Sequence, residues 1–178
     1  FSPLAGSVFA TIGDDASDFG DVVVTGAGST FSASSTGSEL NVGLNGQGVL
    51  DVLAGGAVEF ETINIAANAG SSGTVTVNGT GSQMRGRSRI NVGGDTTAGG
   101  TGSLAVGSNG VVEVTGSLLE GLVVYGDGLL TTGAGSHIDV STVLSVRAGG
   151  LVAMASGTID ATRVLVSGAT LQTTGTSV

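Results

Sequence analysis

The chain contains no cysteine, no tryptophan and no lysine, and each absence excludes a class of structure or partner. Without cysteine there is no disulfide framework and no thiolate metal site. Aromatic residues make up only 3 % of the sequence, which leaves few platforms for stacked bases or sugars. All five basic residues are arginines and the net charge is −9, so we expect no binding to nucleic acid or to anionic membranes.

Long helical periodicity is also missing, and no apolar run approaches the 18 residues of a membrane-spanning helix. We therefore expect no membrane insertion. Hydrophobic residues are 40 % and charged residues 11 % of the chain, a balance that argues against disorder. Glycine, serine, threonine and valine dominate, and they favour strands joined by tight turns.

What the chain does contain is a repeat of about 53 residues. One segment occurs three times, at residues 22–29 (VVVTGAGS), 75–82 (VTVNGTGS) and 129–136 (LLTTGAGS), with spacings of 53 and 54. An apolar residue follows each final serine by two positions, namely Phe31, Met84 and Ile138, and we expect these side chains in the core. A period this long predicts a stacked repeat architecture.

A second motif supports the repeat. It occupies residues 50–60, 104–114 and 144–154, and each copy is a strand, a glycine turn and another strand. Because alternate strand residues share a face, each copy offers four apolar side chains to one interior. The predicted inward residues are Leu50, Val52, Val58 and Phe60, then Leu104, Val106, Val112 and Val114, and finally Leu144, Val146, Val152 and Met154. The same alternation places Val23, Val123 and Leu130 outward, where they would suit lateral packing.

These spacings predict one all-β solenoid over residues 1–178, with about three strands per coil and roughly seven coils. The units are 1–21 (partial), 22–74, 75–128 and 129–178. Only 8 residues separate Ser136 from Leu144, against 22 between Ser82 and Leu104, and the segment equivalent to 90–103 has no counterpart in the third unit. We expect either that one strand and its loop are deleted there or that the coil narrows. The pattern starts and stops within a unit, as in residues 4–9 (LAGSVF). We therefore expect the chain to be part of a longer array or to stack on copies of itself.

Several of these motifs resemble the repeat of bacterial type V secreted and PEP-CTERM-associated proteins. They are V-x-V-x-G-x-G-S, the sequences LNVG at 40–43 and INVG at 90–93, and G-x-L-x-V before a glycine turn. The family often has tryptophan after the corner serine, a position that Phe31, Met84 and Ile138 take here. The resemblance implies a right-handed parallel β-helix, an autotransporter-like passenger at the bacterial cell surface. It implies no active site to carry over.

Four carboxylates crowd one turn, at Asp14, Asp15, Asp18 and Asp21. Carboxylates this close repel one another unless a cation or solvent screens them, and calcium prefers oxygen ligands. The turn is therefore a candidate calcium site, and the alternative is a solvated acidic loop. Nothing in the sequence requires another cofactor.

Arg85, Arg87 and Arg89 alternate along one predicted strand and form the only basic patch, facing outward. This patch suits an acidic polysaccharide or the acidic face of a neighbouring copy. The alternative is charge balance with Glu39 or Asp95 on adjacent coils. The single histidine, His137, aligns with Thr30 and Gln83 at an exposed position beside a corner.

The function favoured by these features is a structural rod segment of a secreted bacterial surface protein, either an adhesin passenger or an extracellular fibre subunit. Its partners would be copies of itself stacked head to tail, the rest of a longer array, or surface glycans. The alternative is a β-helix protein that binds or processes polysaccharides. We predict no catalytic residues, because only Glu59 and Glu113 occupy equivalent outward sites and Ala153 stands there in the third unit. A flat threonine-rich face for glycan or ice is also disfavoured, because the threonines do not recur in register.

Overall fold

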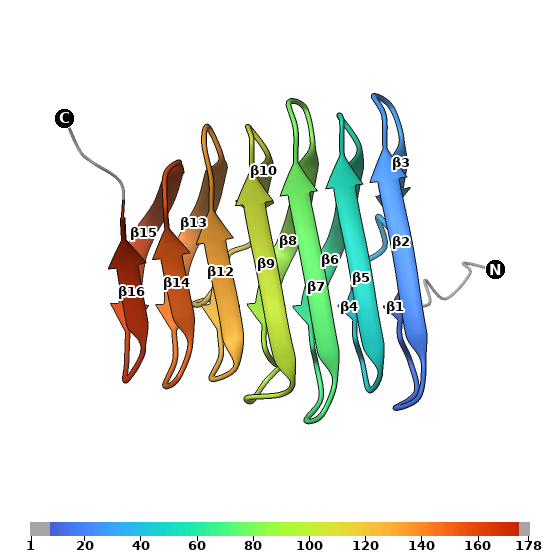
Figure 1. Ribbon diagram of the computed structural model, residues 1–178, viewed down its shortest axis with the longest axis horizontal. Helices are drawn as coiled ribbons and strands as arrows, with labels where there is room; N and C mark the ends of the chain where they lie inside the picture. Colours follow the sequence, from blue (N-terminus) through green and yellow to red (C-terminus); the bar gives the residue numbers. More distant parts are fainter. Residues whose placement is uncertain (1–7, 175–178) are drawn as a thin grey trace.

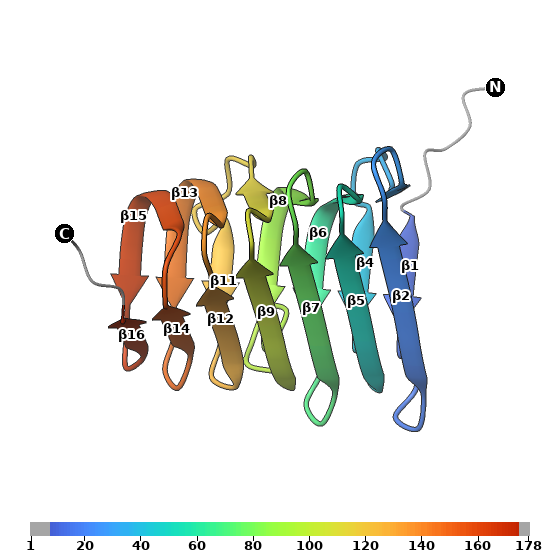
Figure 2. The same cartoon turned by 45° about the horizontal axis from the view of Figure 1, so that its top comes forward.

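The computed structural model describes residues 8–174, which form parallel strands wound into a β-solenoid of about six turns (Figure 1). The strands of two sheets stack along one axis, with β1 and β2 at one end and β15 and β16 at the other (Figure 2). Residues 8–174 contain seven rungs joined by six complete turns, close to the expected seven coils. At about 4.8 Å per rung the stack is about 30 Å long. The predicted continuation of the solenoid over residues 1–7 and 175–178 lies outside the described residues.

One sheet has seven straight strands, one for each rung. They are β2 (Phe19–Thr25), β5 (Gln47–Leu53), β7 (Ser72–Asn78), β9 (Thr101–Gly107), β12 (Gly128–Thr132), β14 (Leu151–Met154) and β16 (Thr170–Thr173). Each strand pairs in parallel with the strand of the next turn.

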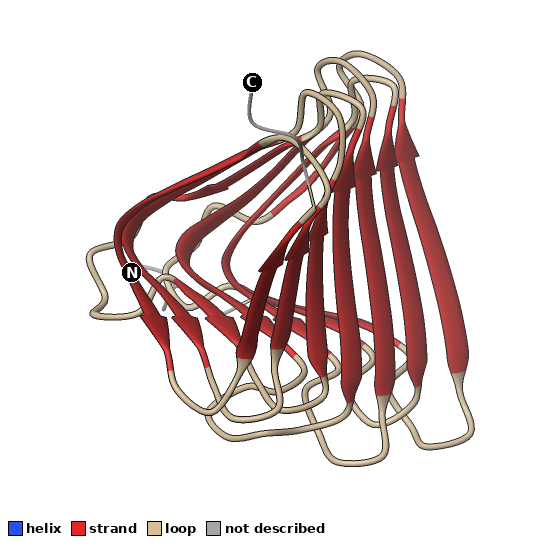
Figure 3. Ribbon diagram, turned by 60° about the vertical axis from the view of Figure 1, so that its left-hand side comes forward, coloured by secondary structure: helices blue, strands red, loops and turns tan. Residues whose placement is uncertain are grey.

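The other sheet has nine strands and is bent (Figure 3). It comprises β1 (Phe9–Ile12), β3 (Thr30–Ser32), β4 (Glu39–Val42), β6 (Ala57–Ile65), β8 (Gln83–Val92), β10 (Val111–Val114), β11 (Leu122–Val124), β13 (His137–Val146) and β15 (Thr158–Val166). At the bend some turns have a register shift, as between Phe60 and Thr62, whereas loops separate β3 from β4 and β10 from β11. Each turn thus has three straight segments, as expected, although several pairs of segments form one bent strand.

The core is a set of columns that run along the axis. Leu50, Val75, Leu104 and Leu130 stack in one column of the seven-stranded sheet, and each is fully buried. Phe31, Val58, Met84, Val112 and Ile138 form a column of the bent sheet. Burying one such side chain contributes about 1.5–3 kcal/mol. All the side chains predicted to lie in the core are buried except Phe31 and Met154, which are half-buried near the two ends of the stack.

The third unit is built differently from the prediction. Leu144 does not align with Leu104; it pairs with Leu122 and Val164 in the bent sheet. No strand is missing, because β13 supplies both halves of the bent sheet in one strand. The third unit is shorter because its corner between β13 and β14, residues 147–150, is shorter than the 93–100 corner between β8 and β9. A strand–glycine–strand pattern looks alike at both corners of the coil, so the motif alone does not say which corner it occupies.

Two of the three predicted outward residues are buried. Val23 is 53 % exposed as expected, but Leu130 and Val123 are fully buried. Leu130 lies one residue closer to its corner serine than Val75 does, and it pairs with Leu104 in the core column. Val123 lies between Asn91 and Ser145 in a column that is buried in all three rungs.

Glycine is required where the chain leaves the bent sheet. Gly13, Gly43 and Gly93 have φ values of 74°, 76° and 77°, and a Cβ on any of them would collide with the backbone at the start of β5, β7 or β12, respectively, one rung further along the stack. Among the described residues no helix is long and apolar enough to cross a bilayer.

Candidate functional site

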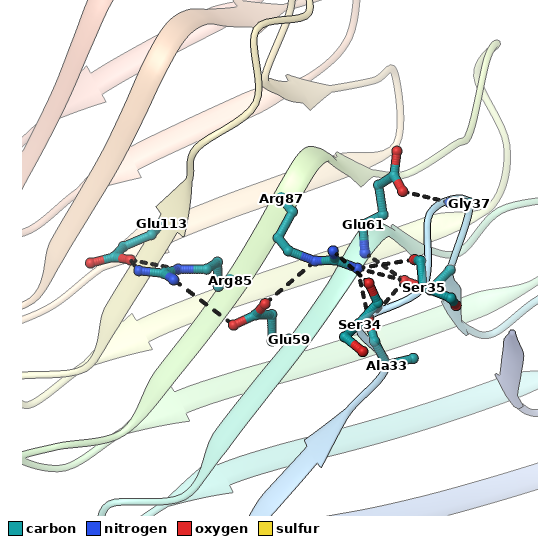
Figure 4. Close-up of polar contacts among 10 residues, drawn as sticks. Ala33, Ser34, Ser35, Gly37, Glu59, Glu61, Arg85, Arg87 and Glu113 are labelled. Carbon is teal, nitrogen blue, oxygen red and sulfur yellow. Dashed lines mark hydrogen bonds and ion pairs between the residues drawn. The ribbon is translucent and has the colours of Figure 1, made fainter. Parts of the chain in front are cut away.

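A ladder of charges lies on the outer face of the bent sheet (Figure 4). Glu59 of β6, Arg85 of β8 and Glu113 of β10 are in register on adjacent rungs. Arg85 donates from Nε and Nη2 to Glu113 Oε2, at 2.9 and 2.6 Å, and its Nη1 lies 3.9 Å from Glu59 Oε2. The hydrogen bond and the charge of Glu113 raise the pKa of Arg85. The charge of Arg85 is therefore paired with two carboxylates of the same chain.

Arg87 fixes the 33–38 loop, which joins β3 to β4. Its guanidinium donates to the carbonyl oxygens of Ala33, Ser34 and Ser35, at 2.8, 3.0 and 3.1 Å. It also donates to the Ser38 hydroxyl at 3.0 Å. One side chain of β8 thus satisfies four hydrogen-bond acceptors in a loop that lies two rungs earlier, between β3 and β4.

Glu61 holds the same loop from the second turn. Its carboxylate accepts a hydrogen bond from the Gly37 amide, and its own amide donates to the Ser38 hydroxyl at 3.0 Å. Glu59 Oε1 lies 3.4 Å from Arg87 Nε and links the loop contacts to the charge ladder. The predicted basic patch therefore pairs with Glu59 and Glu113, not with Glu39 or Asp95.

The third predicted arginine belongs to a separate cluster. Arg89 Nε donates to the carbonyl oxygen of Glu120 at 3.2 Å. The Glu120 carboxylate lies 2.6 Å from Arg147 Nη2, and the Arg147 guanidinium lies 4.7 Å from the centre of the Tyr125 ring. Burial acts to raise the pKa of the Glu120 carboxyl. The hydrogen bonds from Ser145 and Arg147 and the positive charges of Arg147 and Arg89 outweigh this effect, so the pKa is lowered overall. Burial raises the pKa of the Tyr125 hydroxyl, which donates to the Asp95 carbonyl.

An asparagine ladder, which the sequence analysis did not identify, runs along three neighbouring rungs. Asn64 Nδ2 donates to Asn41 Oδ1 at 2.9 Å, and Asn91 Nδ2 donates to Asn64 Oδ1 at 2.8 Å. All three are at most 4 % exposed. The ladder stops at Asn91, whose Oδ1 has no partner because Val123 follows in the column. The repeated pattern of an asparagine between two branched apolar residues was the available signal.

The four predicted calcium ligands lie at the corner between β1 and β2 and at the start of β2. Asp18 closes this turn, because its amide donates to the Asp15 carbonyl at 2.8 Å and its carboxylate accepts from the Asp15 amide at 3.3 Å. Asp21 lies on β2, beside Val49. Across residues 8–174 no group of three or more carboxylates or imidazoles is gathered for metal binding. The calcium site stays a prediction.

His137 occupies the position expected for it. It shares its column with Thr30 and Gln83, and its side chain is 41 % exposed. Its Nδ1 lies 2.7 Å from the Thr158 hydroxyl and 3.9 Å from Asp160. A catalytic relay needs the nucleophile on one ring nitrogen and the carboxylate on the other. Because both neighbours face the same nitrogen, this group does not have that geometry.

The outer face of the bent sheet also has a hollow of about 450 Å³ near the last rung. It is lined by Leu119, Glu120, Val143, Thr162, Arg163 and Leu165. A second hollow of about 300 Å³ crosses β7, β9 and β12 on the outer face of the seven-stranded sheet. It lies where the small residues Ala105, Gly107 and Gly133 leave space between larger side chains. Neither hollow contains Arg85, Arg87 or the acidic corner, so the predicted sites and the hollows do not coincide.

These groups mainly hold the solenoid together: ion pairs and amide ladders join adjacent rungs, and arginine side chains fix the loops at the bend. A comparison with protein-family models, curated proteins and solved structures finds no match to this chain.

Proposed function

We propose that this chain is a structural rod segment that holds or spaces other groups. The observation that carries the proposal is the unbroken core, whose columns continue in register from β2 to β14. Each rung covers the next, so the stack resists bending as a single body. The polar contacts serve the same end, because Arg85, Arg87 and Glu61 link rungs or loops of different turns.

The setting we propose is the outside of a bacterial cell, as part of an adhesin passenger or an extracellular fibre. The motif resemblance to type V secreted and PEP-CTERM-associated repeats supports this setting. The acidic charge and the absence of cysteine and lysine agree with it. The rod would position binding groups at a distance from the cell surface, through stacking and display without catalysis.

Double spin labelling tests the rod directly, because a chain without cysteine accepts two unique labels. Val23 and Gln172 lie in one outward column at opposite ends, and both are exposed. With Val23→Cys and Gln172→Cys we expect a narrow distance distribution near 30 Å, from six rung spacings of about 4.8 Å. A broad or much shorter distribution would contradict a rigid rod.

Glycan binding is the second candidate, and the hollow beside Arg163 favours it. Aliphatic walls, a threonine hydroxyl and the Arg163 cation suit a sugar carrying a carboxylate, and the Glu120 carboxylate that also lines the hollow is paired with Arg147. Binding of acidic oligosaccharides that is lost in Arg163→Gln but kept in Arg85→Gln would support this function over a purely structural one.

A further inference from the structure

The exposed apolar side chains are concentrated at the two ends of the rod. Ten large hydrophobic residues are exposed among residues 8–174, and only Leu118 and Leu119, in one loop, lie away from the terminal rungs. Four lie on the first rung and four on the last: Val8, Phe9, Phe19 and Val23, and Val164, Leu165, Val166 and Leu171. Between the ends, the rungs cover one another.

The last rung exposes the ends of core columns. Val164, Val166 and Leu171 are 44 %, 46 % and 44 % exposed. Their partners on the preceding rung, Leu144, Val146 and Val152, are at most 1 % exposed. The side chains at this end thus have the inward direction and aliphatic character of the core but are covered on one side only. One more rung with the same columns would bury them.

The first rung holds the other ends of these columns, where Ala10 and Val22 are half-buried and Ile12 is 5 % exposed. Ala10 and Ile12 of β1 lead the columns that end at Val164 and Val166. Val22 of β2 leads the column that ends at Leu171. If β1 and β2 of a second copy lay on β15 and β16, the register already used between rungs would continue across the junction.

The strand edges at both ends are open to such pairing. Among the described residues, β1, β2 and β3 form the sheet edges on the first side of the stack, and β15 and β16 form those on the last. Natural edge strands are commonly blocked by charges, proline or bulges, yet residues 164–166 and 170–173 carry no charge and no proline. In the shared register Arg163 would lie beside the exposed Phe9 of the second copy, a suitable pair for a cation–π contact.

We propose that the β15–β16 end of one copy binds the β1–β2 end of a second copy and extends both sheets across the junction. This inference rests on the proposed rod function and names its partner. Because the two binding surfaces differ, a stack of any length keeps one free first-rung surface and one free last-rung surface. Assembly can therefore continue without closing into a ring.

Sedimentation velocity over a range of concentrations tests the proposal with three double variants. Val166→Lys/Leu171→Lys blocks the last rung, and Phe9→Lys/Phe19→Lys blocks the first. Ala105→Lys/Leu118→Lys is the control, since it adds two lysines on the outer surface of interior rungs, whereas Leu119 lines the hollow beside Arg163 and Leu165 of the last rung. Thermal melting by circular dichroism checks folding, and Leu171→Lys alone replaces the first variant if that variant unfolds.

We expect the parent chain and the control to form a series of oligomers that lengthens with concentration. Each blocked variant alone should stay monomeric, with end-to-end affinity reduced at least about tenfold. An equimolar mixture of the two should stop at a heterodimer. Each variant keeps one working end, the two working ends are of opposite kinds, and both outer ends of the resulting dimer are blocked. A closed dimer of the parent chain, monomers at every concentration, or association insensitive to the end variants would overturn the proposal. A monomer with a narrow spin-label distance would overturn it and leave the rod function intact.

Discussion

At the residue scale, alternation decides most of the structure. Val75 and Val77 face the core while Thr74 and Thr76 face outward, and the same pattern holds for Leu104 and Val106 in the next rung. Every inward position on an interior rung is stacked between two others, so a wrong side chain there disturbs three rungs at once. The outward positions carry no such constraint.

Val106→Asp tests this difference. Val106 is 1 % exposed, so a carboxylate there would be buried without a partner and should lower the free energy of unfolding by about 3–5 kcal/mol. Val77→Asp should do the same. The matched control is Ala105→Asp, one residue away on the outer face. Urea denaturation measures both effects, and equal midpoints for Val106→Asp and Ala105→Asp would refute the facing assignment.

Glu120 predicts a pH-dependent contribution to stability. Its pKa in the folded chain lies below the ordinary value of 4.5, so the contribution is present above that value. It is lost as pH falls through the folded pKa, because protonation breaks the pair with Arg147. Glu120→Gln should therefore be less stable than the parent at pH 7, by up to about 1 kcal/mol, and this difference should shrink as the pH falls below 4.5. Denaturation midpoints measured between pH 3 and pH 7 check this, with the exposed Asp139→Asn as control.

At the scale of elements, the bend of the nine-stranded sheet needs the most support. Two loops, 33–38 and 115–121, leave the solenoid there, whereas β6, β8, β13 and β15 pass through the bend as single strands. The interrupted turns keep their place through side chains of uninterrupted ones. Arg87 and Glu61 hold the first loop, and Arg89 holds the backbone of the second at Glu120.

Loss of Arg87 should release the 33–38 loop without unfolding the rod. In Arg87→Gln we expect amide hydrogen exchange of residues 34–38 to be at least about tenfold faster, equivalent to about 1.4 kcal/mol of local opening. Exchange in β7 and β9 should stay unchanged. Arg85→Gln is the control, because Arg85 contacts only Glu59 and Glu113. Equal exchange of the loop in the parent and in Arg87→Gln would show that other contacts hold it.

At the scale of the whole molecule, neighbouring rungs bury the core side chains unequally along the axis. In the columns that end at Val164, Val166 and Leu171, the interior side chains are at most 1 % exposed, whereas these three on the last rung are 44 %, 46 % and 44 % exposed. Stability in stacked repeats is close to a sum over rungs and their interfaces, so opening begins where an interface is missing.

Hydrogen exchange at low protein concentration should therefore be graded along the rod. We expect the fastest exchange in β16 and the slowest in β7 and β9, which lie far from both ends. Raising the concentration should slow exchange in β16 if a second copy covers it. A uniform rate along the axis would mean that the solenoid opens as one cooperative unit.

By itself, the sequence determined the all-β class, the stacked repeat, the inward face of most strands and the shared column of Thr30, Gln83 and His137. These features follow from period-two alternation and from glycine turns, which are local. It did not determine to which sheet Leu144 belongs, on which face Leu130 lies, or that Arg85 and Arg87 pair with Glu59, Glu113 and the 33–38 loop. Only the tertiary structure decided these, because a strand's neighbour lies one coil away, and coil length varies with each corner.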